Sequence, residues 1–247
     1  MTSPLAAPPP RHLKSAPITE ALVDLRVEPA LPDLAALDAF RSETASTFPE
    51  IHEQVQIKSV ISLAQAVPAE RRPTGYMMRS ADKTRVVQAQ LGGLTVSQLA
   101  PYTKWDDLRD LAKSVAGTYF ANAGSRSITR WALRFINKIE VPRGAELGQY
   151  FRVAPFLQPD FPQALEGAFL RFVIPYEGAR VILTQVSGEV SSSSSDRIAV
   201  ILDIDAFKVG PIPSEGDALW ASLEQLREIK NKVFFGCLTE KTVRMFE

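Results

Sequence analysis

The segment from Ile128 to Val141 alternates two kinds of side chain, and this alternation constrains the fold more than any other feature of the sequence. A period of two is that of a β-strand, whose successive side chains point to opposite faces. The segment therefore predicts a strand with one packed face and one cationic face. The packed face would hold Thr129, Trp131, Leu133, Phe135, Asn137 and Ile139, and the cationic face would hold Arg130, Arg134 and Lys138.

Three cations on one strand face require acidic neighbours, because same-face positions two apart lie about 7 Å from each other. Acidic candidates occur in two further predicted strands, as Glu20 and Asp24 and as Asp203 and Asp205. One interpretation is therefore a structural network of salt bridges between strands. The alternative is an anion-binding site for phosphate or nucleic acid, built from these three cations and from Arg79, which ends a predicted strand.

Asp203 and Asp205 share one face of their predicted strand, which gives a second pair of interpretations. Two carboxylates at this spacing suit Mg²⁺ or Mn²⁺, because both metals prefer oxygen ligands. The same carboxylates can instead pair with neighbouring arginines. The sequence leaves both interpretations open.

Strand patterns joined by short turns, together with separate amphipathic helices, run through the rest of the chain. Helices are predicted from Asp33, from Thr103 and from Ser214, each begun by a residue that can cap it. This order predicts an α+β fold with helices packed on one face of antiparallel sheets, in a shape that resembles helix-grip and TATA-binding-like arrangements. The predicted strands cover residues 19–27, 55–67, 75–80, 84–91, 94–99, 128–141, 165–176, 180–190 and 196–209.

The predicted elements fall into two successive units of similar order. A Pro- and Ala-rich tail over residues 1–15 is expected to be disordered, because it offers few side chains to pack. Residues 16–124 then read as a β-α-β-β-β-β-α unit and residues 125–247 as a β-β-β-β-α unit. We expect the two units to form one compact body.

The composition argues against several classes of function. Lys and Arg total 28, and Asp and Glu total 28, so the formal net charge is zero. Binding to nucleic acid or to a membrane surface is therefore not indicated by charge. The sequence lacks the common phosphate-loop, dinucleotide, zinc-protease and nucleophile-elbow motifs. No catalytic residue and no cofactor is predicted.

Cysteine content and hydropathy bear on location. A single cysteine, Cys237, cannot form an intramolecular disulfide, which favours a reducing compartment. No signal-peptide pattern and no apolar run of membrane-spanning length is recognisable. A cytoplasmic location is expected.

Six collinear stretches lie between residues 16 and 247. They are 16–22 (APITEAL), 79–82 (RSAD) with Val87 and Gln88 after it, 99–102 (LAPY) leading to Trp105, 130–137 (RWALRFIN), 201–205 (ILDID) and 231–235 (NKVFF). Together they resemble a sporadically distributed bacterial protein family of unknown function. The resemblance implies a bacterial protein. Because patchy distribution is typical of mobile islands, toxin–antitoxin pairs and phage-defence loci, it also implies such a setting.

Three functional hypotheses follow from these observations. The favoured one is a non-enzymatic interaction protein, antitoxin-like or defence-associated, whose ligand is a protein partner or a second copy of the chain. The second is a phosphate- or nucleotide-handling site in which the four cations hold the anion and Asp203 with Asp205 holds a divalent metal. The third is an apolar small-ligand cavity between a sheet and a helix.

Overall fold

The computed structural model describes residues 9–58, 70–124, 126–155, 158, 160, 162, 166–188 and 196–247. Its strands are β1 (Ile18–Glu28), β2 (Glu50–Lys58), β3 (Glu70–Arg79), β4 (Arg85–Gln90), β5 (Gly93–Leu99), β6 (Ser127–Pro142), β7 (Ala168–Tyr176), β8 (Ala179–Gly188) and β9 (Arg197–Pro213). Its α-helices are α1 (Asp38–Thr44), α2 (Trp105–Ala123), α3 (Ala218–Cys237) and α4 (Glu240–Val243). Short 3₁₀ turns cover Leu34–Leu37, Leu147–Gln149 and Arg244–Phe246.

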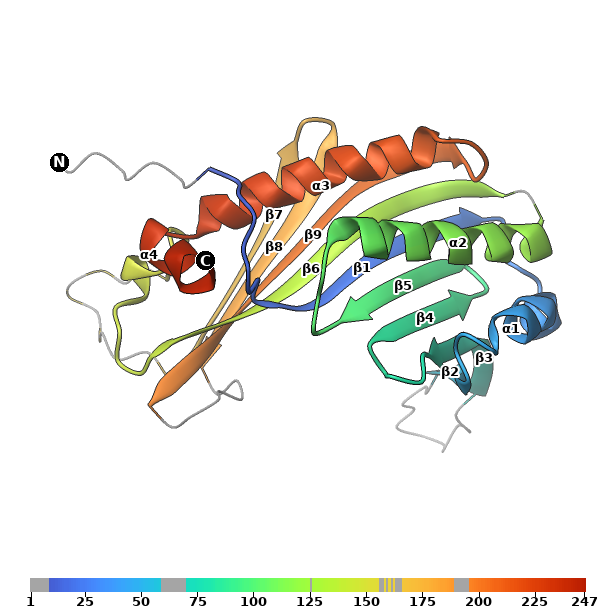
Figure 1. Cartoon of the computed structure of the whole chain (residues 1–247), viewed down its shortest axis with the longest axis horizontal. Coiled ribbons are helices and arrows are strands. Elements are labelled where there is room, and N and C mark those ends of the chain that lie inside the picture. The colour runs from blue at the N-terminus through green and yellow to red at the C-terminus, as the bar shows by residue number, and fades with distance from the viewer. Residues whose placement is uncertain are drawn as a thin grey trace, which may run out of the picture. The chain divides into compact units, whose positions relative to one another are not determined.

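The nine strands form one open antiparallel sheet in the order β2-β3-β4-β5-β1-β6-β9-β8-β7, so β2 and β7 are its edge strands. Figure 1 shows these strands with the helices. The predicted α+β class with an antiparallel sheet is confirmed. The likeness to helix-grip and TATA-binding-like arrangements stays a prediction.

The chain divides into two compact units, and neither is a continuous segment. Unit 1 comprises the described residues within Met1–Ala21, Ala132–Lys208 and Trp220–Glu247. Unit 2 comprises those within Leu22–Trp131 and Val209–Leu219. The strands β1 and β6 each contribute residues to both units, whereas the sequence-based division places its boundary between residues 124 and 125.

The core of unit 2 is formed by α2 and the strands beside it. One stripe of α2 is buried, and α2 contacts β5 and α1 (Figure 1). Tyr119 on this stripe is fully buried and donates its hydroxyl to the backbone oxygen of Gln90 at 2.9 Å. The predicted cap at Thr103 is wrong: Lys104 is the N-cap, and the Thr103 hydroxyl donates instead to the carboxylate of Asp107 at 2.7 Å.

The turn between β4 and β5 contains a glycine that is needed for a contact with β1, and the sequence does not show this contact. Gly92 and Gly93 predict a hairpin turn because both accept positive φ. In the structure only Gly93 of this pair has positive φ, at 150°, and a Cβ there would lie 2.0 Å from the backbone oxygen of Leu25. Gly93 therefore permits the close approach of β5 to β1.

The core of unit 1 lies between α3 and its strands. Leu202 and Ile204 of β9 and Leu223 and Leu226 of α3 are fully buried. The helix begins at Ala218 and not at the predicted Ser214. Gly216 explains the difference, because its φ of 85° is incompatible with a helical turn.

The segment over residues 9–15, within the predicted tail, contacts the C-terminal elements of unit 1. The Arg11 guanidinium pairs with Glu240 and with Glu247, each at 2.7 Å. Leu13 is buried, and the Ser15 amide donates to the Phe246 oxygen at 3.1 Å. These contacts order the residues that precede β1.

Some predicted boundaries differ from the structure or fall outside the described residues. The strand predicted over 55–67 begins earlier, at Glu50, and is described only as far as Lys58. The hairpin tip at 191–195 and the start of the strand at 165 lie outside the described residues. None of the described helices has the length and apolar content needed to cross a bilayer.

Candidate functional site

The alternation along β6 is confirmed from Leu133 to Val141, but at the start of the strand Thr129 is only half-buried, and Ile128 and Ala132 on the opposite face are buried. The side chains at Trp131, Leu133, Phe135, Asn137 and Ile139 are buried, whereas the three cations on the other face are half-buried. Asn137 is a polar exception on the packed face, and its amide nitrogen donates to the backbone oxygen of Leu202 at 3.0 Å. A buried amide needs such a partner, because without one its desolvation would not be compensated.

In unit 2 the cation Arg130 is held by Asp24 of β1. Its Nη1 lies 2.7 Å from Asp24 Oδ2. The same carboxylate accepts a hydrogen bond from Thr95 Oγ1 at 2.7 Å and pairs with Arg26 Nη2 at 2.9 Å. Because the Asp24 side chain is only 9% exposed, these three donors replace the water that the carboxylate has lost.

The hydrogen bonds continue from Arg26 to a group of glutamines on neighbouring strands. Arg26 Nη1 donates to Gln90 Oε1 at 2.8 Å, and Gln90 Nε2 donates to Gln54 Oε1 at 3.2 Å. Gln54 Nε2 in turn donates to Gln88 Oε1 at 2.9 Å. This network links β1, β4 and β2 through side chains and so supports the register of the strands.

Arg79, at the end of β3, lies beside Glu50 of β2. Arg79 Nη1 is 3.8 Å from Glu50 Oε1, and His52 Nε2 is 3.0 Å from the same oxygen. The pKa of Glu50 is lowered, first by the hydrogen bond with His52 and then by the charge of Arg79. All three side chains are at least one-third exposed, so we expect little stabilisation from these pairs.

In unit 1 the cation Arg134 is held by Asp203 of β9. Arg134 Nε and Nη2 donate to the two carboxylate oxygens at 2.9 and 2.6 Å. The pKa of Arg134 is raised, first by this hydrogen bonding and further by the charges of Asp203, Asp205 and Glu20. Lys138 lies 3.1 Å from Glu140 Oε1 on the same strand.

Each of the four predicted anion-binding cations therefore has a carboxylate within 4 Å. Arg79 and Arg130 belong to unit 2, whereas Arg134 and Lys138 belong to unit 1. A cation that already has an anionic partner attracts a further anion less strongly. The geometry favours the interpretation as salt bridges, and the anion site stays a prediction.

The predicted metal pair does not gain a third ligand in the described part of the chain. No group of three or more His, Cys, Asp or Glu side chains is arranged there to hold a metal ion. Asp203 is hydrogen-bonded to Arg134, and the negative charge of Asp205 further raises the pKa of the same guanidinium. A carboxylate that accepts two arginine hydrogen bonds has fewer lone pairs left for a metal.

The outer strand of unit 1 presents apolar side chains to solvent. On β7, Phe169 is 65% exposed, Phe172 42% and Val173 56%. Phe169 and Val173 lie on one face of the strand and Phe172 on the other, because side chains alternate. The sequence does not predict this surface, because apolar residues on both faces of a strand are typical of a buried strand. Pro175 was the available signal, because proline within a strand indicates a sheet edge.

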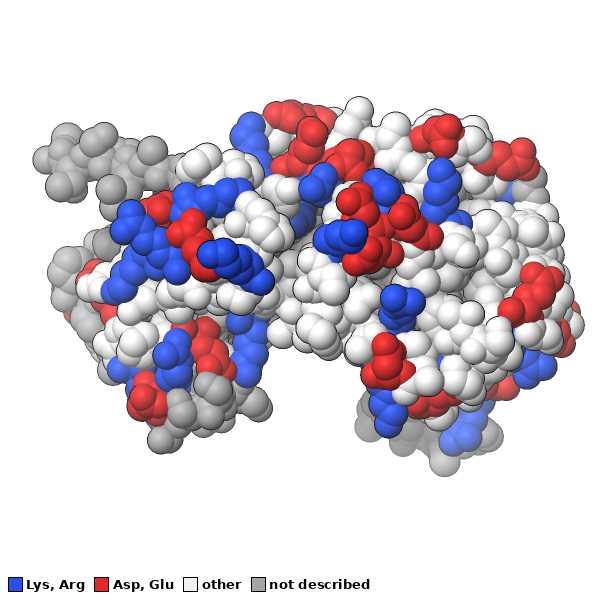
Figure 2. Space-filling model, in the orientation of Figure 1, with Lys and Arg blue, Asp and Glu red and all other residues white. Residues whose placement is uncertain are grey.

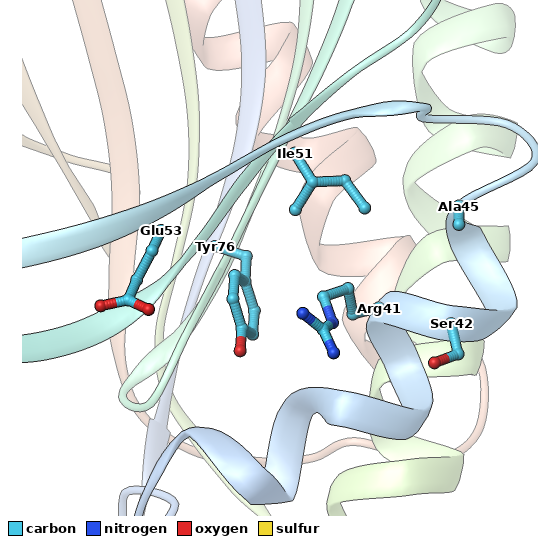
Figure 3. A pocket seen from close by; sticks show the side chains of 6 residues that line it. All are labelled: Arg41, Ser42, Ala45, Ile51, Glu53 and Tyr76. Atoms are coloured by element: carbon cyan, nitrogen blue, oxygen red, sulfur yellow. The ribbon is translucent and has the colours of Figure 1, made fainter.

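A surface pocket of about 390 Å³ lies between α1 and the strands β2 and β3 in unit 2 (Figure 3). No pattern in the sequence indicates this pocket, because its residues come from separate elements that meet only in the tertiary structure. Ala45 and Ile51 contribute apolar surface, and the polar residues of the lining are Arg41, Ser42, Glu53 and Tyr76.

A lysine on α3 is buried in unit 1. Lys230 Nζ lies 3.8 Å from the centre of the Phe135 ring. Burial lowers the pKa of Lys230 to about 7, and the charge of Arg227 acts in the same direction. At neutral pH the Lys230 amine is therefore partly neutral, and the neutral form is compatible with its apolar surroundings.

Charged side chains of both signs are interspersed over the face shown in Figure 2, without a broad area of one sign. This distribution agrees with the zero net charge. It gives no electrostatic footprint for nucleic acid on that face.

No protein-family model matches the chain. A search of curated proteins also finds no match. The resemblance to a sporadically distributed bacterial family therefore stays an expectation from the quoted stretches.

Proposed function

We propose that this chain is a non-enzymatic interaction protein that binds an extended segment of a partner protein at the outer edge of β7. The observation that carries the proposal is the exposure of Phe169, Phe172 and Val173 on an edge strand. Exposed apolar side chains scattered singly need no explanation, but three within five residues of one edge strand, two on one face and one on the other, favour association of that strand with a partner.

The backbone of β7 supports strand addition. β7 pairs with β8 in unbroken register from Ala168 to Tyr176, so it is a regular strand with one side paired. Edge strands are usually protected by bulges, charges or proline, because their free backbone groups otherwise recruit another strand. On β7, Arg171 and Pro175 are such protective features. We propose that the backbone groups between these two residues pair with the partner strand.

A partner strand would gain from side chains as well as from backbone hydrogen bonds. In β-strand addition the backbone gives affinity and the alternating side chains give specificity. A partner segment with alternating apolar residues would cover Phe169 and Val173 on one face and Phe172 on the other. An acidic residue placed near Arg171 would add charge complementarity.

The test is site-specific photo-cross-linking in the organism of origin. A photoreactive residue replaces Phe169 in one variant and the exposed Glu228 of α3 in a control. We expect a discrete adduct with a second protein from position 169 and none from position 228. The purified partner should then bind the purified chain, and Val173→Pro, which removes a backbone donor, should weaken that binding by at least about tenfold.

Three outcomes would contradict the proposal. Equal adducts from both positions would show contact without specificity. An adduct with the mass of two copies of this chain would show that the β7 edge binds a second copy of the chain and not a different protein. Unchanged affinity of the Val173→Pro variant would mean that the β7 edge is not the binding surface.

A further inference from the structure

The charges around the pocket of unit 2 are unbalanced. Arg41 Nη2 lies 3.3 Å from Asp38 Oδ1, so the guanidinium already has an anionic partner. The Glu53 side chain forms no ion pair or hydrogen bond with any side chain that the structure describes, while its backbone is paired with that of Tyr76 in the β2–β3 ladder. Asp38, Arg41 and Glu53 together carry a net charge of −1, which favours a cation as the occupant.

Apart from the Arg41 guanidinium, which only donates, the polar side chains of the pocket can accept hydrogen bonds. The Tyr76 hydroxyl donates to Asp38 Oδ1 at 3.4 Å, and the Ser42 hydroxyl donates to the Asp38 backbone oxygen at 2.9 Å. Both hydroxyl oxygens therefore have lone pairs left to accept a hydrogen bond. Glu53 adds a carboxylate, which accepts only. A ligand with N–H donors matches this set.

The positions of the charges indicate where a cation would sit. Figure 3 shows Arg41 and Glu53 on opposite sides of Tyr76. The Arg41 guanidinium carbon lies 5.1 Å from the centre of the Tyr76 ring. A second cation would avoid Arg41 and approach Glu53 and the Tyr76 hydroxyl, while Ile51 and Ala45 offer apolar surface to its carbon chain.

We propose that this pocket binds a primary alkylamine cation. The ammonium group donates to the Glu53 carboxylate and to the Tyr76 hydroxyl oxygen, and the alkyl chain lies along Ile51. The volume of about 390 Å³ is near the lower end of small-molecule pockets, so the chain is short. The amine is either a free small molecule or the side chain of a lysine, and both present the same chemistry.

The test is a set of NMR titrations of the ¹⁵N-labelled full chain at neutral pH. The probes are n-butylamine, Nα-acetyl-lysine N-methylamide, n-butanol and tetramethylammonium. We expect both primary amines to give saturable shifts of residues in α1, β2 and β3, with Kd of about 1 mM. Butanol lacks the charge and tetramethylammonium lacks N–H donors, so each should bind at least about tenfold more weakly.

The two sources of the amine are separated by the same titrations. Tighter binding of the lysine derivative would indicate a lysine side chain, and tighter binding of butylamine would indicate a free amine. Both results support the proposal.

Variants locate the interaction. Glu53→Gln should weaken both amines by about tenfold without unfolding the protein, because Glu53 is exposed. Glu43→Gln is the matched control, because Glu43 is an exposed glutamate on α1 that does not line the pocket. Three results would overturn the proposal: no saturable shifts, equal binding of butanol, or unchanged affinity in Glu53→Gln.

Discussion

The guanidinium of Arg134 donates two parallel hydrogen bonds to the carboxylate of Asp203, one to each oxygen. The two residues lie 69 positions apart in the sequence, on β6 and β9. A bidentate pair of this kind fixes the relative direction of both side chains as well as their distance. It therefore reports directly on whether β6 and β9 are correctly paired.

Replacing Arg134 by alanine should lower the free energy of unfolding by about 1–2 kcal/mol, because the Asp203 carboxylate loses both donors. The Asp203 side chain is 16% exposed and cannot regain full hydration, while the 44% exposure of Arg134 limits the loss. Urea denaturation measures the change. Arg180→Ala, at an exposed β8 position, is the control and should shift stability by less than about 0.5 kcal/mol. Equal effects of the two changes would contradict the role given to the pair.

Gly93→Ala should destabilise unit 2 strongly. The new Cβ would lie 2.0 Å from the Leu25 backbone oxygen, so β5 and β1 would have to separate. We expect a loss of more than about 3 kcal/mol or failure to fold, measured by thermal unfolding. Gly92→Ala is the matched control, because no atom lies within 4 Å of a Cβ at that position. A Gly93→Ala protein with the melting temperature of the wild type would exclude this account.

Lys230→Met should stabilise the protein at neutral pH. The pKa of Lys230 falls from its ordinary value of 10.5 to about 7 on burial, so between these values the unfolded chain binds a proton that the folded chain does not. The free energy of unfolding of the wild type should therefore rise with pH across this window. Below pH 7 both states bind the proton, so this group should cause no further change with pH.

The methionine variant lacks this titrating group. The difference in free energy of unfolding between the variant and the wild type should therefore be largest near pH 7 and should shrink as the pH approaches 10.5. Urea denaturation of both proteins across this range measures it. An advantage that is independent of pH would show that Lys230 is charged in the folded state throughout.

Cys237 should resist thiol reagents in the folded protein. Burial raises the pKa of its thiol to about 12, so almost no thiolate forms at neutral pH. It is also the single cysteine of the chain, so the total labelling signal belongs to it. Labelling should be slow in buffer and rapid in denaturant. Fast labelling under native conditions would show that α3 opens at its C-terminal end.

The sequence predicts most elements because local patterns decide them. The alternation along β6 is visible without any knowledge of its neighbours, and Asp24 and Asp203 were both among the candidate partners of its cations. Their assignment to Arg130 and Arg134 depends on the register between distant strands. That register is set by the assembled sheet and by no local pattern.

The exposed edge and the pocket depend still more on tertiary structure. Phe169 and Phe172 have the residue types of a buried strand, and only the strand order shows that one side of β7 has no neighbouring strand among the described residues. The pocket joins α1 to β2 and β3, so no single segment displays it. The predicted start of α3 at Ser214 is wrong for a local reason, because Gly216 has positive φ and interrupts the expected capping pattern.

Unit 1 draws on the first, middle and last parts of the printed sequence. During synthesis on the ribosome, β6 is therefore made long before α3 can cover it, and β9 is made just before the helix. A truncated product that ends before Ala218 would leave Leu202, Ile204 and Phe135 without their helix, and quality-control proteases should clear it. A nonsense mutation late in the gene would then act as a complete loss of the protein.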